Sequence, residues 1–152
     1  MELKKLTKLE KTKVLKLLMD YWKERGMPDY DKKWTQKYLD EGHRKEIKND
    51  EFFVYKNNNK LVGMVSLITD ISDIAEIRDF VVKPKYRNKG YGRMILNELI
   101  ILAKDRKIRK LYALTFPKYK KFLKSFGFEE EGFLKSHFIK GEDLTIMSKF
   151  LK

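Results

Sequence analysis

Hydrophobic residues in the N-terminal part of the chain recur mostly at helical spacing. Residues 3–6 predict a short strand, and Thr7 with Glu10 three positions later makes a capping-box pattern at the start of a helix. Leucine, valine and aromatic positions then repeat every three or four residues up to Gly26, where this helix is expected to end. Residues 31–41 predict a second, shorter helix.

From residue 52 onward the pattern is mainly that of strands, with two further helical stretches. The predicted strands cover residues 52–56, 61–68, 74–82, 108–116, 128–139 and 144–151, and the predicted helices cover residues 91–104 and 118–126. This order, βααβββαβαββ, predicts an α/β fold: a central mixed sheet of about seven strands, with one parallel pair and helices on both faces. Residues 1–152 are expected to form a single domain.

A buried strand, a basic glycine-containing loop and the start of a helix follow one another between residues 74 and 92. The loop reads Arg87-Asn88-Lys89-Gly90-Tyr91-Gly92. Backbone N–H groups gather at such a helix N-terminus, and its partial positive charge favours an anion. Glycine lets the backbone approach a phosphate closely. The loop therefore predicts a cradle for a pyrophosphate.

The chain carries a formal net charge of +13, from 35 lysines and arginines against 22 acidic residues. This excess favours an anionic partner: a phosphorylated cofactor, or an acidic macromolecule such as ribosome or tRNA. Most of the lysines are scattered, which is also typical of a charged surface that supports solubility and ion pairs. One cluster surrounds the glycine loop and consists of Lys83, Lys85, Arg87, Lys89 and Arg93.

Cysteine is absent, which excludes disulfides and thiolate metal sites and favours a reducing compartment. The two histidines are His43 and His137, and too few other ligand types cluster near either one to predict a metal. No apolar run reaches the ~18 residues of a membrane span, and no signal-peptide core follows Met1. We expect a cytoplasmic protein with no metal and no membrane partner.

Together these features resemble the GNAT superfamily of acyl-CoA-dependent N-acetyltransferases. The family signature Arg/Gln-x-x-Gly-x-Gly/Ala is matched by Arg87, Gly90 and Gly92. Further matching positions flank the loop: Val82, Pro84 and Tyr86 before it, and Phe122 with Phe126-Gly127-Phe128 about one helix later. The order of elements fits along nearly the whole chain, whereas the glycine patterns of P-loop and dinucleotide-binding folds are missing.

The resemblance implies acetyl-CoA as co-substrate. The family's splayed strand bonds the pantetheine through its main chain, which corresponds here to Phe80, Val81 and Val82. The pyrophosphate would lie on the loop and the first helical turn: Arg87, Asn88, Lys89, Gly90, Tyr91, Gly92 and Arg93. The implied reaction is direct transfer of the acetyl group to a primary amine of a small molecule or a protein. Assembly as a homodimer is a further expectation.

Attack on a thioester requires a neutral amine, whereas an alkylammonium has a pKa near ~10, so a group must accept the proton. Glu76 falls where the histone-acetylating branch of the superfamily carries its general-base glutamate. Two interpretations stay open: Glu76 is the base, or it pairs with Arg78 or with a lysine near the N-terminus. Strand alternation predicts that Arg78 shares the face of Glu76 and that Asp79 lies on the opposite face.

Many family members carry a tyrosine that protonates the leaving thiolate, but the matching position here is Leu123. Tyr119 lies one turn earlier on the predicted helix and is the candidate acid. Two alternatives stay open. Water can protonate the thiolate, since its pKa of only ~8.5 makes the step undemanding. Tyr119 would then be a packing aromatic or lie beside the adenine.

Four aromatic residues lie in the segment that caps the acceptor site in this family: Trp22, Tyr30, Trp34 and Tyr38. Core packing and cation–π contact with an alkylammonium are both open for them. His137 is expected to be a structural histidine or to face the acceptor cleft. A second class of function also stays open: a GNAT-like protein that binds CoA, or binds RNA in a salt-dependent manner, without turnover.

Overall fold

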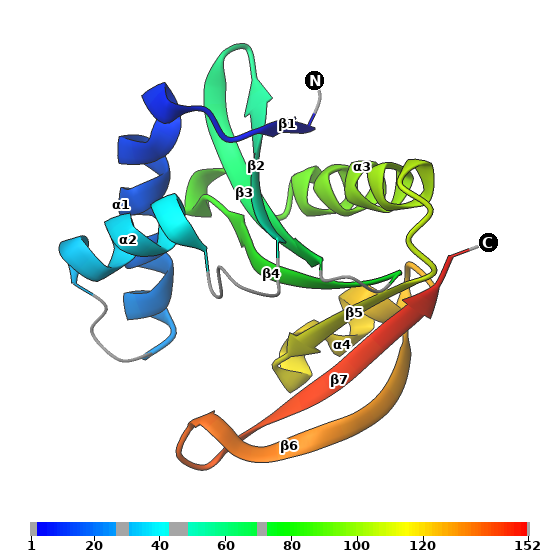
Figure 1. Cartoon of the computed structure of the whole chain (residues 1–152). Helices are drawn as coiled ribbons and strands as arrows, with labels where there is room; N and C mark the ends of the chain where they lie inside the picture. The colour runs from blue at the N-terminus through cyan, green and yellow to red at the C-terminus, as the bar shows by residue number, and fades with distance from the viewer. Residues whose placement is uncertain (1–2, 27–30, 43–48, 70–72, 152) are drawn as a thin grey trace.

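The computed structural model describes residues 3–26, 31–42, 49–69 and 73–151. Its centre is a seven-stranded mixed sheet in the order β1-β2-β3-β4-β5-β7-β6 (Figure 1). The strands are β1 (Leu3–Lys5), β2 (Asn49–Asn57), β3 (Lys60–Thr69), β4 (Ile74–Val82), β5 (Lys110–Thr115), β6 (Glu129–Ile139) and β7 (Glu142–Phe150). The helices are α1 (Lys11–Glu24), α2 (Lys32–Glu41), α3 (Tyr91–Asp105) and α4 (Lys120–Lys124), with 3₁₀ turns η1 (Lys8–Glu10), η2 (Pro84–Tyr86) and η3 (Pro117–Tyr119).

Helices cover both faces of the sheet, so the fold class predicted from the sequence is confirmed (Figure 1). The α1–α2 pair buries its apolar stripe against β2, β3 and β4, and the members of this cluster include Val14, Leu18, Trp22, Val54 and Met64. On the other face, the helical spacing of Ile95, Leu99 and Ala103 puts all three fully inside the core under α3. Burial of these two layers is the main source of stability of the fold.

The predicted capping box is present at the start of α1. The Glu10 carboxylate accepts hydrogen bonds from the Thr7 N–H at 2.9 Å and from the Thr7 hydroxyl at 2.7 Å. It closes the η1 turn, and the α-helix proper begins at Lys11. The helix predicted over residues 118–126 is shorter than expected, because Pro117 starts a 3₁₀ turn and α4 follows only at Lys120.

β4 and β5 are parallel neighbours, and their pairing is short. Only three residue pairs join them, from Ile74 with Lys110 to Glu76 with Tyr112. Beyond these pairs the two strands diverge (Figure 1), so β4 residues 77–82 have no β5 partner. Main-chain groups on that edge of β4 are therefore available to a ligand that lies between the strands.

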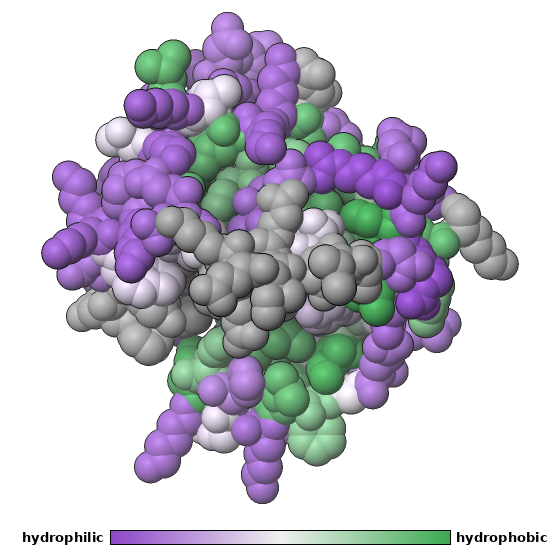
Figure 2. Space-filling model, viewed as in Figure 1, coloured by the Kyte–Doolittle hydropathy of each residue, from purple (hydrophilic) through white to green (hydrophobic). Residues whose placement is uncertain are grey.

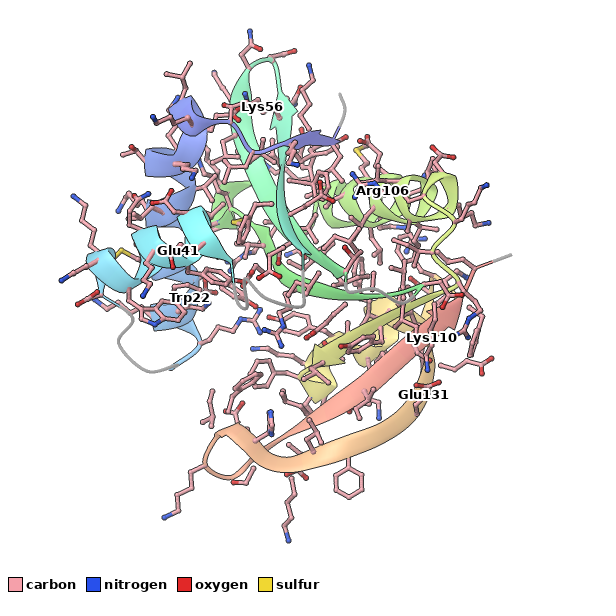
Figure 3. All side chains as sticks on the ribbon, viewed as in Figure 1. Trp22, Glu41, Lys56, Arg106, Lys110 and Glu131 are labelled. Atoms are coloured by element: carbon pink, nitrogen blue, oxygen red, sulfur yellow. The ribbon has the colours of Figure 1, made fainter. Side chains whose placement is uncertain are left out.

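Ion pairs tie the sheet together at the opposite end. Lys110 of β5 reaches across β7 and donates to both carboxylate oxygens of Glu131 on β6, each at 2.7 Å (Figure 3).

Hydrophilic residues cover most of the visible surface, and hydrophobic ones gather at the lower end of this view (Figure 2). Among the described residues, no helix is both long and apolar enough to cross a membrane.

Candidate functional site

A cavity of about 650 Å³ opens where β4 and β5 diverge. Its walls come from α1, α2, β4, the loop before α3, the start of α3, β5, η3, α4, β6 and β7. Most of the residues predicted from the sequence line it together: Glu76, Phe80, Val81, Val82, Arg87, Asn88, Gly90, Gly92, Arg93 and Tyr119. Lys89 and Tyr91 are not among the lining residues.

A β-bulge shapes the wall that β4 contributes. Met64 of β3 pairs with Val81, and Ser66 pairs with Arg78, so β4 has one residue more than β3 between these two pairs. Asp79 lies in this stretch and has a φ of 46°. The extra residue resets the alternation of side chains. Ile77 packs into the core under α3, whereas Val81, four positions later, packs with the α1–α2 cluster.

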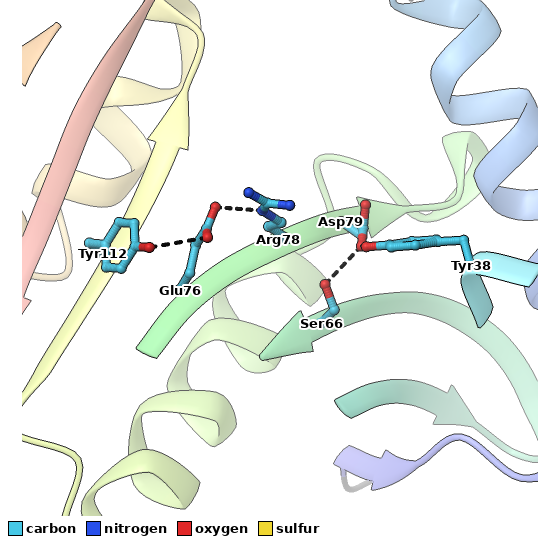
Figure 4. Close-up of polar contacts among 6 residues, drawn as sticks. All are labelled: Tyr38, Ser66, Glu76, Arg78, Asp79 and Tyr112. Atoms are coloured by element: carbon cyan, nitrogen blue, oxygen red, sulfur yellow. Dashed lines mark hydrogen bonds and ion pairs between the residues drawn. The ribbon is translucent and has the colours of Figure 1, made fainter. Parts of the chain in front are cut away.

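Asp79 consequently faces the α1–α2 side of the sheet. Its carboxylate accepts hydrogen bonds from the hydroxyls of Tyr38 at 2.5 Å and Ser66 at 2.8 Å (Figure 4). The prediction that Asp79 lies on the face opposite to Glu76 is wrong, because simple alternation takes no account of the bulge. Burial, together with the negative charge of Asp79, raises the pKa of Tyr38, which therefore donates as a neutral phenol.

Glu76 lies at the point where the two strands separate. It is the last β4 residue paired with β5, and only 3% of it is exposed. One carboxylate oxygen accepts from Arg78 Nε at 2.5 Å, and the other accepts from the Tyr112 hydroxyl at 3.1 Å (Figure 4). The ion pair with Arg78, one of the two interpretations of the sequence, is therefore present. The same carboxylate lines the cavity, so the base interpretation keeps its geometry.

The glycine loop contains two residues with positive φ and leads directly into a helix N-terminus. Asn88 and Gly90 have φ values of 58° and 83°, and α3 begins at Tyr91. The first N–H groups of a helix have no partner within the helix, and here they belong to residues beside the cavity. A Cβ at Gly92 would lie 3.7 Å from the Phe122 ring, which is an ordinary contact distance. A side chain at this position would therefore occupy space beside the cavity without straining the backbone.

Arg87, the first residue of the loop signature, is held by the protein itself. Its two Nη atoms donate to the Glu24 carboxylate at 2.6 and 2.8 Å, and its Nε donates to the Val82 carbonyl at 2.9 Å. The hydrogen bond from Arg87 lowers the pKa of Glu24 and keeps this carboxylate ionised. Through its side-chain bonds to Glu24 of α1 and Val82 of β4, Arg87 fixes the loop against both elements. Its main-chain N–H also donates to the Pro84 carbonyl within the η2 turn.

The remaining cations of the loop differ in how they are placed. Arg93 lines the cavity, where its Nη1 donates to the Ser125 hydroxyl at 2.9 Å. Lys89 is exposed and lies outside the cavity lining. The Tyr91 ring turns to the core, where its hydroxyl accepts from Asn57 at 2.7 Å. Arg93 is therefore better positioned than Lys89 to contact a ligand in the cavity.

Arg93→Ala is expected to weaken CoA binding about tenfold, whereas Lys89→Ala should change the affinity by no more than about threefold. A held guanidinium forms charge-assisted bonds to phosphate, while a flexible surface lysine contributes little. Titration calorimetry with CoA and with dephospho-CoA measures both effects. An equal loss for the two ligands assigns Arg93 to the pyrophosphate, and a loss for CoA alone assigns it to the 3′-phosphate. Equal losses for the two variants would contradict the ranking.

Tyr119, the candidate acid, is held at the cavity by a residue that the sequence did not point to. Arg25, which follows the last residue of α1, donates a hydrogen bond from Nη2 to the Tyr119 hydroxyl. Its guanidinium also lies 4.4 Å from the Tyr119 ring centroid and 4.6 Å from that of Tyr21. Since the phenol oxygen accepts from Arg25, its own proton is free to donate elsewhere. Burial raises the pKa of Tyr21 to about 12.

Three of the predicted aromatic residues form one wall of the cavity. Trp34 stacks on Tyr38 with ring centroids 5.5 Å apart, and Trp22 meets Trp34 edge-on at 5.6 Å. Trp22 and Tyr38 are buried, while Trp34 is 40% exposed. The same residues thus pack against one another and line the cavity.

The other predicted residues fall elsewhere. Tyr30 and His43 lie outside the described residues. His137 is exposed on β6 and is not part of the cavity lining, whereas its neighbour Phe138 is. Tyr112 and Ser66 orient the two carboxylates and were missed, because nothing local in the sequence marks a hydroxyl that bonds to a residue on another strand.

The family model for the acetyltransferase (GNAT) family matches residues 13–128, which is most of the chain. The chain belongs to this family. It is 34% identical over 115 residues to a protein of Methanocaldococcus jannaschii described as an uncharacterized N-acetyltransferase, covering 68% of this chain and 49% of that protein. It is 32% identical over 83 residues to an amino-acid acetyltransferase of Mycobacterium tuberculosis, covering 53% and 47% of the two chains. The matches span a third to a half of these curated relatives.

Solved structures share the fold at low sequence identity. Spermidine N-acetyltransferase from Vibrio cholerae, in complex with CoA and spermine, superposes with a TM-score of 0.81 at 20% identity, covering 97% of this chain and 94% of that one. Ribosomal-protein-alanine N-acetyltransferase from Brucella melitensis gives 0.77 at 24% identity, covering 99% and 100%. These likenesses establish the fold and leave the acceptor open.

Proposed function

We propose that this protein transfers an acetyl group from acetyl-CoA to a primary amine. The observation that carries the proposal is the cavity itself. The β4 edge that has no β5 partner, the N-terminal turn of α3 and a buried carboxylate all face one space. Membership of the acetyltransferase family and the CoA-bound neighbours support acetyl-CoA as the donor. The neighbours act on chemically different acceptors, so they support the reaction rather than a particular amine.

In this proposal the donor lies between the diverging strands. The amides of its pantetheine arm pair with the main chain of Phe80, Val81 and Val82, and its pyrophosphate lies on the N–H groups from Asn88 to Arg93. The main-chain N–H groups near Val82 polarise the thioester carbonyl. Its carbonyl carbon then faces the acceptor side of β4, where Glu76 lies.

The amine nitrogen attacks the thioester carbon, and the resulting tetrahedral intermediate expels the CoA thiolate. The amine loses a proton to Glu76, directly or through one water, and the carbon–sulfur bond is replaced by an amide bond. Tyr119 donates its proton to the thiolate and recovers it from solvent. The chain contains no cysteine, so a cysteine acyl-enzyme plays no part.

A two-stage experiment tests the proposal. Differential scanning fluorimetry with CoA should show a concentration-dependent rise in the melting temperature, because only the folded state binds the ligand. A thiol-release assay with acetyl-CoA over a panel of amines and peptides should then show turnover. Absence of CoA stabilisation defeats the proposal at its first step. CoA binding with no turnover on any amine would instead indicate a binding protein.

Tyr119→Phe is expected to lower kcat by about three- to tenfold, with no change in CoA affinity. The effect should be modest, because a thiolate with a pKa of ~8.5 leaves with little assistance. Tyr55→Phe removes a buried hydroxyl outside the cavity lining and is the matched control. Single-turnover measurements separate the chemical step from product release. A loss in kcat of a hundredfold or more would show that Tyr119 is indispensable as the acid. An unchanged kcat would show that water protonates the thiolate.

The other expectations from the sequence keep the status of predictions. They are the cytoplasmic location, the absence of a metal, the homodimer and an acidic macromolecular partner such as ribosome or tRNA. The charge of the cavity rim is accounted for by the proposed cofactor, whereas the scattered surface lysines are not.

A further inference from the structure

One guanidinium in the cavity has an unused binding face. Arg78 lines the cavity from β4, and its side chain is 25% exposed. Its Nε donates to Glu76 at 2.5 Å, but within the described part of the chain no group accepts from Nη1 or Nη2. In Figure 4 the one contact marked for this side chain is the bond between its Nε and Glu76. Four N–H donors of a largely buried cation that lines the cavity thus have no acceptor among the described residues.

A guanidinium with both Nη atoms available binds a carboxylate in preference to a neutral or cationic group. Burial disfavours the charged form of Arg78, but the hydrogen bond and the charge of Glu76 more than offset this, and its pKa lies above the usual value. The group is therefore permanently cationic. The planar pair of Nη atoms matches the two oxygens of a carboxylate, with two parallel hydrogen bonds.

The position of Arg78 relative to the base limits the size of the ligand. Glu76 and Arg78 are two residues apart on the same face of β4 and touch each other. An acceptor whose amine lies at Glu76 therefore has its anionic group only a few bonds from that amine. Four arginines, Arg25, Arg78, Arg87 and Arg93, and two carboxylates, Glu76 and Asp79, line the cavity. This excess of positive charge suits an acceptor that carries an anionic group better than a dication.

We propose that the acceptor is a free amino acid, whose carboxylate is held by the two Nη atoms of Arg78 while its amino group faces Glu76. This inference rests on the proposed function and names its substrate class. The aromatic wall of Trp22, Trp34 and Tyr38 would then receive the side chain. A plain diamine would use the aromatic rings but would place a positive charge against Arg78.

Matched sets of three compounds test the inference on the wild-type protein. Each set contains an amino acid, its amide and the amine left after decarboxylation, and kcat/KM is measured by thiol release from acetyl-CoA. The amino acid should be preferred over its two analogues by at least about 100-fold, because each analogue leaves the Nη atoms of Arg78 unpaired. This comparison needs no variant, so it stands even where a variant fails to fold.

Variants then assign the preference to Arg78. Arg78→Met should bring the ratio between amino acid and amine close to one, and Arg78→Lys should keep part of it. These variants also remove the bond from Arg78 to Glu76. That loss lowers kcat/KM for the amino acid and for the amine by the same factor and leaves their ratio unchanged. A change in the ratio therefore reports on the contact between Arg78 and the substrate carboxylate alone. Arg25→Met removes another arginine of the cavity, the one bonded to Tyr119, and should lower the rate while keeping the ratio.

The inference and the proposed function fail in different ways. Equal kcat/KM within the sets, or a preference that survives in Arg78→Met, would overturn the inference. So would acetylation of amines or peptides with none of the free amino acids accepted, although transfer itself would then stand. Absence of both CoA binding and transfer would remove the proposed function, and the inference with it.

Discussion

Gly90→Val and Gly92→Val are each expected to reduce CoA binding below detection in titration calorimetry while the protein stays folded. Gly92 lines the cavity, and a Cβ there meets only ordinary contacts, so the larger side chain occupies the space of the pyrophosphate rather than disturbing the core. Gly90 has a φ of 83° and nothing within 4 Å of an added Cβ. A β-branched residue there costs about 1–2 kcal/mol and alters the cradle itself.

Gly141→Val is the matched control for Gly90→Val. Gly141 has a φ of 87° and open space around it, but it lies in the β6–β7 turn, outside the cavity lining. It should carry a similar backbone cost and bind CoA normally. Circular dichroism and melting temperature establish that all three variants fold. Unchanged affinity in Gly92→Val would remove the loop from the binding site.

Glu76→Gln should lower turnover by about 100-fold or more at neutral pH without changing the affinity for CoA. The amide keeps the shape of the carboxylate and removes its ability to take a proton. Activity should partly return as the pH rises, because the fraction of neutral amine grows toward its pKa near ~10 and the base matters less. The measurement is a pH profile of kcat for the wild type and the variant.

The variant also breaks a buried ion pair with Arg78, so a structural cost must be separated from a catalytic one. Glu51→Gln provides the comparison. Glu51 is 7% exposed, pairs with Arg106 and Lys5, and lies outside the cavity. Both variants should lose stability, since removing one partner leaves a charge without its counterion. If Glu76→Gln resembles Glu51→Gln in turnover as well as in stability, Glu76 is a structural residue and Asp79 becomes the next candidate base.

The local signals in the sequence were sufficient for most of the fold and for the glycine loop. Strand β4 has the predicted bounds, and the loop that follows it leads into a helix at Tyr91, as predicted. These features depend on neighbours within a few residues, through periodicity and turn chemistry. The parallel pair of β4 and β5 was also expected from the order of elements, whereas its length of three residue pairs was not.

The contacts that organise the candidate site were not accessible in the same way. The bulge at Asp79 depends on how β4 pairs with β3, so alternation alone put this carboxylate on the wrong face. Arg25 and Tyr119 are 94 residues apart, and Glu24 and Arg87 are 63 apart. No periodicity links such pairs, since they form only when two packed elements bring their ends together.

The short pairing between β4 and β5 has a consequence for local unfolding of the sheet. Three residue pairs join a half that carries β1 to β4 to a half built from β5, β7 and β6, and the bond from Arg25 to Tyr119 adds a side-chain link between them. Local opening takes place where few main-chain bonds cross between cooperative units. One hydrophobic cluster under α3 spans both halves, so we expect opening to begin along the β4–β5 boundary when the gap is empty. A ligand bonded along the free edge of β4 would complete the missing strand pairing and make the sheet open as one body.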